Sequence, residues 1–289
     1  MLFGLIGGKN IAKYTIADYL WSEISHISGV KFNFKVFPIE SLLQLYQFYW
    51  QYLENDNFIG FNIALPWKSM VSVLSDQNNY ISKDCKYINT AFKKNGLVRT
   101  ANTDVIGVEK SLKQKIKLVN KSVLILGGGG AGYPTAIYLL EKYGCKVSIF
   151  DIRRIRTRKE IFVLPNYESL ISKKYDIIIN ASPVGKYFLN NPPKSFTSPL
   201  NADMFGKIIK LGGVVLDMNY FPYMTELLKI GKAHSITTIP GTEMLVYQAL
   251  ESLSNYIDTK LTDQDSYKLI ESVNNYSIKK RKTNIWKKN

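Results

Sequence analysis

The sequence has few of the residues that build disulfide frameworks and zinc sites. Its 289 residues include two cysteines, Cys85 and Cys145, and two histidines, His26 and His234, which lie far apart along the chain. A disulfide framework and a cysteine-rich zinc site are therefore excluded, and we expect no metal. Because so little cysteine suits a reducing compartment, we expect a cytoplasmic protein.

Long hydrophobic runs are also missing. No apolar stretch approaches the roughly 18 residues of a membrane span. The first residues, MLFGLIGGKN, are apolar only briefly and have no basic leader, so they predict a first strand and not a signal peptide. A hydrophobic content of 46% and a charged content of 21% are typical of a globular protein. The length is sufficient for two domains.

The charge is strongly one-sided, with a net value of +15. Residues 278–289, IKKRKTNIWKKN, contain six lysines or arginines and no acid. We interpret them as a basic tail that ends as a frayed, solvated segment, and contact with RNA or a membrane surface is the alternative. No motif that reads nucleic acid is present, so no such partner is expected. A positive field also suits an anionic small substrate and a dinucleotide.

Short apolar runs alternate with helical patterns from about residue 120 to residue 240. Continuous apolar strands separated by helices predict a doubly wound parallel sheet of the Rossmann type. The expected strands are Ser122–Leu126, Lys146–Phe150, Tyr175–Asn180 and Gly213–Asp217. Before them, residues 2–7, 31–37 and 58–64 are expected strands, with helices near 16–28 and 40–54. Further helices are expected from residue 104 to about 118, after Gly241, and near 263–276.

The clearest local motif is SVLILGGGGAGYPTAIYLLEKYG, residues 122–144. An expected strand ends at Leu126, the residues from Gly127 to Gly132 satisfy G-x-G-x-x-G, and a helical pattern follows. Glycines there permit a tight turn and let the backbone approach a pyrophosphate, whose charge meets the helix N-terminus. The motif therefore predicts a dinucleotide site, whose expected contacts are Gly127, Gly129, Gly130 and Ala131.

Asp151, at the end of the next expected strand, bears on the choice of dinucleotide. An acid there hydrogen-bonds the adenosine ribose and repels a 2′-phosphate, which favours NAD. Arg153, Arg154 and Arg156 follow closely, and an arginine at this place suits the 2′-phosphate of NADP. The sequence favours NAD and leaves NADP open.

The part of the chain before the glycine-rich motif contains an amine and a carboxylate that fit the oxidation of an alcohol. Lys68 follows the run GFNIALPW, and Asp104 follows Asn102-Thr103 at the start of the expected connecting helix. Taken singly, Lys68 is a typical surface lysine, and Thr103 or Asp104 a typical helix cap. Moving a hydride to or from an alcohol carbon also requires a group that moves the hydroxyl proton, and a lysine near a carboxylate can do so.

These residues, in this order, resemble the shikimate dehydrogenase family, including its quinate dehydrogenase and shikimate dehydrogenase-like branches. The family pattern G-x-N-V-T-x-P-x-K is matched by Gly60, Asn62, Pro66 and Lys68, and the patterns N-T and N-T-D-x-x-G by Asn89-Thr90 and by Asn102 to Gly107. The later patterns are matched by Gly127 to Ala131, by Asn180 to Gly185, by Asp217, Tyr220, Pro222 and Thr225, and by Gly241, Met244, Leu245 and Gln248. The matches extend over nearly the whole chain except the tail.

The resemblance implies an activity and a set of roles. The family transfers a hydride between a nicotinamide and a ring hydroxyl of shikimate or a relative, an anionic polyol. The implied catalytic pair is Lys68 and Asp104. The implied substrate contacts are Asn89, Tyr220 and Gln248, and Met218 and Gly241 are implied to lie near the nicotinamide.

Three departures from the family pattern concern the substrate and the cofactor. Where the family has H-S-x-S-P, with serines on the substrate carboxylate, this chain has Lys13 and Thr15 at the serines, and both are expected substrate contacts. The family threonine of the lysine motif is Ala64 here, which offers no hydroxyl. Many relatives end the cofactor strand in Asn-Arg, but this chain has Asp151-Ile152, which points toward the quinate-type or shikimate-like branches.

The expected organisation is a substrate domain, residues 1–103, completed by helices 242–277. A Rossmann-type domain covers residues 104–241, and the tail covers residues 278–289. A monomer and a homodimer are both left open. Three functions stay open: a shikimate enzyme, a quinate or amino-shikimate enzyme, and a sensor that binds a dinucleotide without turnover.

Overall fold

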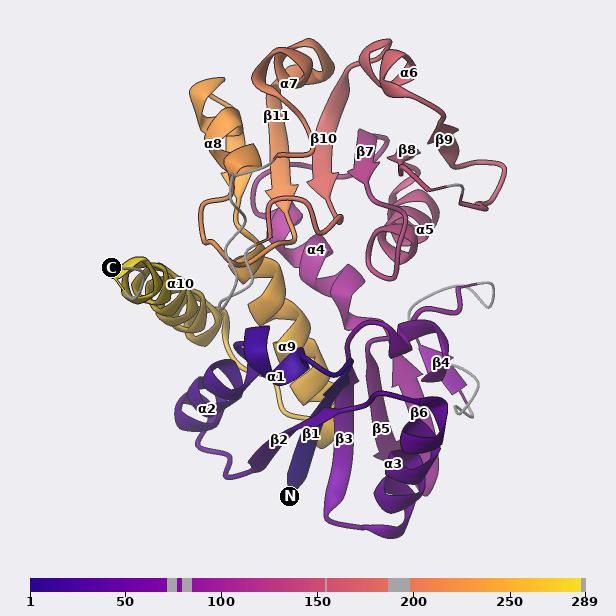
Figure 1. The fold of residues 1–289 in the computed structure, drawn as a ribbon, viewed down its shortest axis with the longest axis vertical. Helices are drawn as coiled ribbons and strands as arrows, with labels where there is room; N and C mark the ends of the chain where they lie inside the picture. Colours follow the sequence, from indigo (N-terminus) through magenta and orange to yellow (C-terminus); the bar gives the residue numbers. More distant parts are fainter. Residues whose placement is uncertain (72–76, 80–84, 154, 187–197, 287–289) are drawn as a thin grey trace. The chain divides into compact units, whose positions relative to one another are not determined.

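The computed structural model describes residues 1–71, 77–79, 85–153, 155–186 and 198–286, and it confirms the α/β class (Figure 1). The chain forms two compact units. Unit 1 comprises Met1–Thr103 and Ala249–Val273, and unit 2 comprises Asp104–Gln248 and Asn274–Asn289. The second passage between the units therefore falls between Gln248 and Ala249, some residues after the expected boundary at residue 242.

Unit 1 is built on a six-stranded mixed sheet. Its strands are β1 (Leu2–Gly7), β2 (Asn33–Pro38), β3 (Phe58–Ile63), β4 (Gln77–Asn79), β5 (Thr90–Lys94) and β6 (Leu97–Ala101), in the order β2-β1-β3-β5-β6-β4. β1 pairs in parallel with β2 and β3, whereas β5 is antiparallel to both of its neighbours. The β5–β6 hairpin was not expected. The helices of unit 1 are α1 (Ile11–Tyr14), α2 (Ala17–Ser28) and α3 (Leu42–Glu54), followed by the short 3₁₀ helix η1 (Trp67–Ser69).

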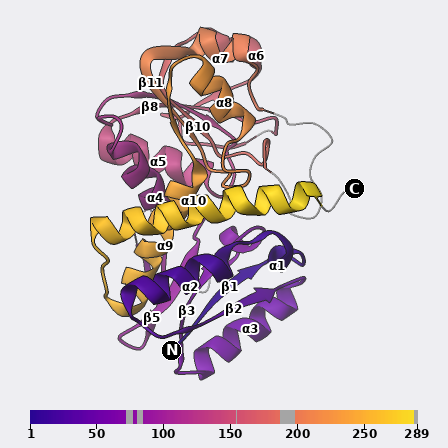
Figure 2. The same ribbon diagram turned by 90° about the vertical axis from the view of Figure 1, so that its left-hand side faces the viewer.

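Aromatic side chains fill the core of unit 1 on both faces of this sheet, with α2 and α3 on opposite faces (Figure 2). On the α2 face, Trp21 stacks on Phe34 and packs against Phe3, at ring-centroid distances of 5.7 and 5.5 Å. On the α3 face, Phe48 and Tyr52 meet Phe61 edge-on at 5.0 and 4.8 Å. Phe48 and Tyr52 of α3 therefore belong to the buried core, and the half-buried Tyr49 packs against it.

Unit 2 contains a parallel sheet of six strands. They are β7 (Ser122–Leu126), β8 (Lys146–Phe150), β9 (Phe162–Leu164), β10 (Tyr175–Asn180), β11 (Ile209–Asp217) and β12 (Thr237–Ile239), in the order β12-β11-β10-β7-β8-β9. Counted along the chain this is the doubly wound order 3-2-1-4-5-6. The order reverses between β7 and β10, and that point is where such sheets bind dinucleotides.

Helices cover this sheet, whose strands are apolar on both sides. Those that contact its strands include α5 (Gly132–Tyr143), α6 (Tyr167–Ile171) and α8 (Glu226–Ala233), and α7 (Ala202–Ile208) packs beside α6 and α8. The other helices of the chain are α4 (Thr103–Lys113), α9 (Gly241–Ile257), which begins in unit 2 and ends in unit 1, and α10 (Asp263–Trp286), which begins in unit 1 and ends in unit 2. Leu124 of β7 and Ile178 of β10 join a buried cluster with Phe205 of α7 and Leu228 of α8. Val123 and Ile125 lie on the opposite side of β7 and are also fully buried. Such two-sided burial explains the continuous apolar runs.

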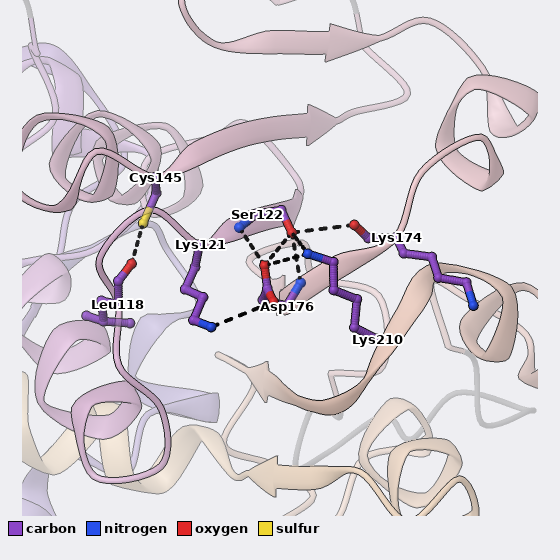
Figure 3. Close-up of polar contacts among 7 residues, drawn as sticks. All are labelled: Leu118, Lys121, Ser122, Cys145, Lys174, Asp176 and Lys210. Carbon is purple, nitrogen blue, oxygen red and sulfur yellow. Dashed lines mark hydrogen bonds and ion pairs between the residues drawn. The ribbon is translucent and has the colours of Figure 1, made fainter.

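The N-terminal ends of three strands of this sheet are tied together by Asp176 (Figure 3). Its carboxylate accepts hydrogen bonds from the Ser122 backbone at 2.8 Å and the Ser122 hydroxyl at 2.6 Å, and from Lys210 Nζ at 2.9 Å. Burial favours the neutral acid, but these hydrogen bonds outweigh it and hold the pKa of Asp176 at about 2. Asp176 therefore links β7, β10 and β11 at the edge opposite the glycine-rich motif.

Two expected helices have other lengths in the structure. The connecting helix α4 ends at Lys113 and not near residue 118, and α10 continues to Trp286 instead of ending near 276. The expectation of a frayed tail from residue 278 is therefore wrong for residues 278–286, which continue the helix. Neither Gly nor Pro interrupts this stretch, so nothing in the sequence ends the helix earlier. Within the described residues, no helix has the length and apolarity needed to cross a membrane, and no cluster of metal-ligating side chains occurs.

Candidate active site and dinucleotide site

The glycine-rich turn of unit 2 lies at the carboxyl end of β7, beside the reversal of strand order. Gly127 has φ +98°, a conformation that favours glycine, and a Cβ on it would lie 2.9 Å from the Ser182 backbone nitrogen after β10. A Cβ on Gly132, the first residue of α5, would lie 1.9 Å from the Gly127 carbonyl oxygen. The turn is thus packed against its own helix and against the β10 loop, which leaves the N-terminus of α5 at the sheet edge.

The outer part of the turn is more open. A Cβ on Gly129 would meet only Arg153, at 3.6 Å, and Ala131 stands at the N-cap of α5 without a capping side chain. The backbone N–H groups at a helix start form a site for an anion such as a pyrophosphate. The residues of this turn therefore fit the predicted dinucleotide.

Asp151 is already engaged by protein groups. Its carboxylate accepts from Gly128 N at 2.8 Å and from the Arg153 guanidinium through Nε at 3.0 Å and Nη2 at 2.9 Å. The Arg153 hydrogen bonds are the main reason that the pKa of Asp151 falls to about 2. The Asp151 side chain is 4% exposed and that of Arg153 is 68% exposed. An arginine thus covers the acid and presents the accessible charge; Arg154 lies outside the described residues.

A buried carboxylate organises the loops that follow β10 and β11. Asp217 accepts from Thr225 Oγ1 at 2.7 Å, from Asn180 Nδ2 at 3.0 Å and from the Asn219 backbone at 3.0 Å. Asn180 Oδ1 in turn accepts from the Ser182 hydroxyl at 2.7 Å. Because it is fully buried, Asp217 has its pKa raised to about 6 despite these hydrogen bonds.

Met218 and Gly241, implied to lie near the nicotinamide, adjoin this network, and Tyr220 and Gln248, implied substrate contacts, belong to the same unit. Met218 N donates to the Asn180 carbonyl at 2.9 Å, so Met218 joins the two loops. Gly241 begins α9, and a Cβ there would lie 2.6 Å from the Asp217 carbonyl oxygen, so only glycine fits. Tyr220 lies in the loop after β11, where its carbonyl accepts from Ser277 Oγ. Gln248 lies on α9 and donates to the Leu245 carbonyl at 3.0 Å.

Unit 1 carries a buried polar cluster around Asn89. Asn89 Oδ1 accepts from Thr103 N at 2.7 Å, and Asn89 Nδ2 donates to Thr103 Oγ1 at 3.0 Å. Asn62 Nδ2 donates to Thr90 Oγ1 at 3.2 Å and to Ser252 Oγ at 2.9 Å. All five residues are buried, and their mutual hydrogen bonds fix the segments that carry them.

The segments of the implied catalytic pair are anchored at this cluster. The Lys68 carbonyl accepts from Ile88 N at 2.9 Å, which places the η1 segment beside the segment of Asn89. The Lys68 side chain is half-buried. Asp104 directly follows Thr103 in the first turn of α4 and is 6% exposed. The backbone bond of Lys68 to Ile88 and the side-chain bonds of Asn89 to Thr103 thus connect the Lys68 segment to the residue before Asp104.

Lys13 and Thr15, two further expected substrate contacts, lie in α1 and between α1 and α2. Lys13 is exposed in the last turn of α1. Thr15 is half-buried, and its Oγ1 accepts at 3.1 Å from the backbone N–H of Ala17, the first residue of α2. Thr15 therefore has a structural role of its own beside the implied one.

Several residues of the site were not singled out from the sequence. Ser182 and Asn180 belong to the matched pattern at the end of β10, so their motif was visible although their hydrogen bonds were not. Ser252 had no local signal, because it reaches Asn62 across 190 residues of chain. Gly128 occupies a variable position of the glycine motif, yet a Cβ there would lie 2.4 Å from Ile155 Cδ1.

Comparison with known proteins places this arrangement in a family, although no family model matches the chain. The chain is 30% identical over 272 residues to the shikimate dehydrogenase (NADP(+)) of Methanococcus maripaludis, covering 90% of this chain and 92% of the relative. It is 29% identical over 265 residues to that of Caldicellulosiruptor bescii, covering 87% and 88%. The crystal structure of shikimate dehydrogenase 1 from Peptoclostridium difficile has the same fold, with a TM-score of 0.81 at 24% identity over 96% of this chain and 99% of that chain.

These relatives also bear on the cofactor. Both curated relatives are named for NADP(+), which does not support the expected preference for NAD and leaves NADP as the cofactor that agrees with them. With a 30% identical relative that spans nine-tenths of its length, the chain belongs to the shikimate dehydrogenase family of oxidoreductases.

Proposed function

We propose that the protein catalyses the reversible oxidation of a ring hydroxyl of shikimate, or of a close relative of shikimate, with a nicotinamide dinucleotide. The observation that carries the proposal is the anchoring of the Lys68 segment beside Asn89, which is itself hydrogen-bonded to the residue that precedes Asp104. A bound dinucleotide supplies or accepts the hydride. The protein has to bind the polyol, hold its hydroxyl and move one proton.

Lys68 and Asp104 are the proposed acid–base groups. In the oxidation, Lys68 Nζ takes the proton of the reacting hydroxyl as the hydride leaves the same carbon, and in the reduction it returns that proton. The Asp104 carboxylate orients the hydroxyl and the ammonium by hydrogen bonding. Its low exposure keeps water from competing for these bonds, which strengthens them.

The remaining substrate contacts are proposed from the residues implied by the family pattern. Asn89, Tyr220 and Gln248 supply amide and hydroxyl groups for the ring hydroxyls. Lys13, an exposed cation in place of a serine, supplies a charge for the substrate carboxylate. Ala64 stands where the family pattern has a threonine, so this chain has one hydroxyl donor fewer for the substrate. Other side chains therefore have to distinguish one substrate from another.

For the cofactor we propose NADP(H). The expectation of NAD assumed a bare carboxylate at Asp151, but Arg153 neutralises that carboxylate and has an exposed guanidinium, which suits a 2′-phosphate. Replacing Arg153 with alanine would then lower the affinity for NADP(H) and shift the preference toward NAD(H). An unchanged preference would contradict this assignment.

The decisive experiment is to follow the absorbance of the reduced nicotinamide with purified protein. NAD and NADP are each combined with shikimate and with quinate, for the natural protein and for Lys68→Met. Turnover that requires Lys68 supports the enzyme, and the best pair identifies its substrate and cofactor. Dinucleotide binding without turnover of any pair would contradict the proposal and favour the sensor.

The other functions have less support. Neither the sensor nor a nucleic-acid role is favoured by relatives that are named as dehydrogenases. For the setting we propose the cytoplasm, in agreement with the two cysteines, which are both buried free thiols.

A further inference from the structure

A buried carboxylate joins the helices α4 and α5 of unit 2. Glu109 of α4 is 5% exposed. Its Oε2 accepts from the Tyr138 hydroxyl at 2.6 Å, and its Oε1 accepts from the Tyr143 hydroxyl. Lys142 Nζ lies 2.9 Å from Oε1 and also donates to the Tyr138 hydroxyl at 2.6 Å. Lys113 Nζ, one turn further along α4, lies 2.9 Å from the same Oε1. We call these five residues the Glu109 cluster.

The Glu109 cluster keeps its carboxylate charged. Burial raises the pKa of Glu109, but the hydrogen bonds from the two tyrosines and the two lysines outweigh it and hold the pKa at about 2. The ammonium groups also lie over the tyrosine rings, with Lys142 Nζ 4.9 Å from the centre of the Tyr138 ring and Lys113 Nζ 5.5 Å from that of Tyr143. Both oxygens of the carboxylate therefore have a donor from α5.

Stability alone does not explain a charged group at this place. Replacing a buried ion pair by apolar side chains of similar volume is often neutral or stabilising. Apolar contacts are not directional, however, so they allow one helix to slide or rotate against another. Directed bonds to both oxygens of Glu109 fix the position of α4 along α5 and its rotation about its own axis. The Glu109 cluster is therefore better explained by the placement of α4.

Helix α4 is also closely fitted against α9. A Cβ on Gly107 would lie 2.6 Å from the Met244 carbonyl oxygen, so the two helices touch through their backbones. Further along α4, Gln114 donates to the Tyr247 hydroxyl. Contacts with α9 and with α5 thus act together on α4, and all of these residues belong to unit 2.

The helices α4 and α5 each begin with a part of the proposed site. Asp104 lies in the first turn of α4, and Gly132, at the end of the glycine-rich turn, is the first residue of α5. Both residues belong to unit 2. The position of the Asp104 carboxylate relative to a dinucleotide on that turn therefore depends on how α4 lies against α5. A displacement of about 1 Å in a reacting group can lower a rate by about 10²-fold.

We propose that Glu109 is a positioning residue of the reaction, which sets the place of Asp104 relative to the bound dinucleotide through its bonds to α5. The inference rests on the proposed function, in which the Asp104 carboxylate orients the reacting hydroxyl. Glu109 acts through α4 and is not assigned a contact with the substrate or with the dinucleotide.

A single turnover followed by stopped flow tests this proposal, with the protein in excess and with the substrate and dinucleotide that the natural protein turns over fastest. Glu109→Leu removes the directed bonds and retains an apolar contact between the helices. We expect the rate of hydride transfer to fall about tenfold or more, with the amplitude and the affinity for the dinucleotide unchanged. A merely structural role would lower the amplitude, because fewer molecules would be folded, and would leave the rate unchanged.

Two further variants frame this result. Tyr138→Phe removes one bond to Glu109 and should slow hydride transfer less than Glu109→Leu does. Asp176→Asn is the matched control, because it changes another carboxylate of unit 2 that binds a lysine and a hydroxyl, at the sheet edge opposite the glycine-rich turn. Its rate of hydride transfer should equal that of the natural protein. The proposal is overturned if Glu109→Leu retains the natural rate, or if Glu109→Leu and Asp176→Asn are slowed equally.

Hydrogen exchange tests the hold on α4 without turnover, which keeps this test separate from that of the proposed function. In Glu109→Leu the amides of α4 should exchange faster than in the natural protein, and those of β7 and β10 at the natural rate. Natural exchange in α4 together with a natural rate of hydride transfer would overturn the role of Glu109 alone. No turnover by the natural protein would overturn the proposed function, and this role with it.

Discussion

The proposed reaction depends on the ammonium of Lys68, which methionine replaces without a large change in side-chain length. We expect Lys68→Met to lower kcat by about 10²–10⁴-fold, as for the loss of a positioned acid–base group. The affinity for NADPH, measured by fluorescence titration, should stay unchanged because the glycine-rich turn is intact. Lys35→Met, a change of an exposed lysine on β2, is the control and should leave kcat at its natural value. Similar losses in both variants would exclude a specific role for Lys68.

Asp217 gives a prediction about pH. Its pKa is raised to about 6 in the folded protein, whereas an unfolded chain has about 4. Between these values the folded state binds more protons, so the contribution of Asp217 to the unfolding free energy falls as the pH rises from about 4 to about 6. Asp217→Asn cannot ionise and lacks this slope.

Denaturant unfolding of both proteins at several pH values measures this effect. The stability deficit of Asp217→Asn relative to the natural protein should be largest near pH 4 and should shrink by on the order of 1–3 kcal/mol by about pH 6. A deficit that is independent of pH would mean that Asp217 is not protonated in the folded protein at pH 4 to 6.

On the scale of elements, the joint between β7 and α5 leaves no room for a side chain. Gly132→Ala would place Cβ 1.9 Å from the Gly127 carbonyl oxygen, so the turn has to shift. We expect a lower Tm and at least a tenfold loss of NADPH affinity, because the helix start no longer faces the pyrophosphate. In Gly129→Ala the Cβ meets only Arg153, at 3.6 Å, so the Tm should be unchanged. An unchanged Tm in Gly132→Ala would show that the turn accommodates a Cβ at this position without loss of stability.

The carboxylate at the opposite edge of the same sheet gives a prediction about stability. Asp176→Asn keeps the shape but replaces one acceptor by a donor that faces Lys210 and Ser122. We expect a loss of about 1–3 kcal/mol in the unfolding free energy near pH 7. Since the pKa of Asp176 is lowered, its stabilisation is complete above the unfolded pKa of about 4 and declines as the pH falls toward about 2. The two proteins should thus converge in acid, and a constant difference would contradict the linkage.

Strands buried on both faces were predictable from the sequence, but pairings between distant segments were not. β7, β8 and β10 have the expected bounds, because a buried parallel strand is a continuous apolar run. The β5–β6 hairpin was missed although Asn95-Gly96, a favoured hairpin turn with positive φ at both residues, marks it. Its strands alternate only weakly, and antiparallel pairing to β3 decides their place.

In the candidate site, too, local features were predictable from the sequence and contacts between side chains were not. The glycine-rich turn follows from local geometry, so its residues were predicted correctly as a tight turn before a helix. Asp151 and Arg153 were both named from the sequence, but their ion pair was not predicted. The sequence does not show which of several nearby arginines hydrogen-bonds the carboxylate. The hydrogen bonds of Ser252 depend on α9 reaching the first sheet, which only tertiary structure reveals.

For the whole molecule, the net charge of +15 predicts how turnover depends on salt. The proposed substrate and NADP(H) are both anions, and a positive protein attracts them at low ionic strength. We expect kcat/KM to fall several-fold between about 0.05 and 0.5 M salt as the Debye length shrinks to a few ångströms, with kcat nearly constant. Steady-state kinetics with a neutral osmolyte as control would check this, and a kcat/KM that does not depend on salt would exclude electrostatic attraction.

The division of the chain into units has a consequence for synthesis on the ribosome. The strands of the unit 1 sheet are complete by residue 101, but Tyr256, which packs on Phe3 at 4.9 Å, belongs to its last segment, residues 249–273. All strands of the unit 2 sheet are complete by residue 239 and emerge before that segment. The unit 2 sheet can therefore form as soon as residue 239 has emerged. The unit 1 sheet is synthesised earlier, but its aromatic face stays uncovered until Tyr256 follows. The nascent chain is then a natural client for chaperones that shield apolar surface until translation ends.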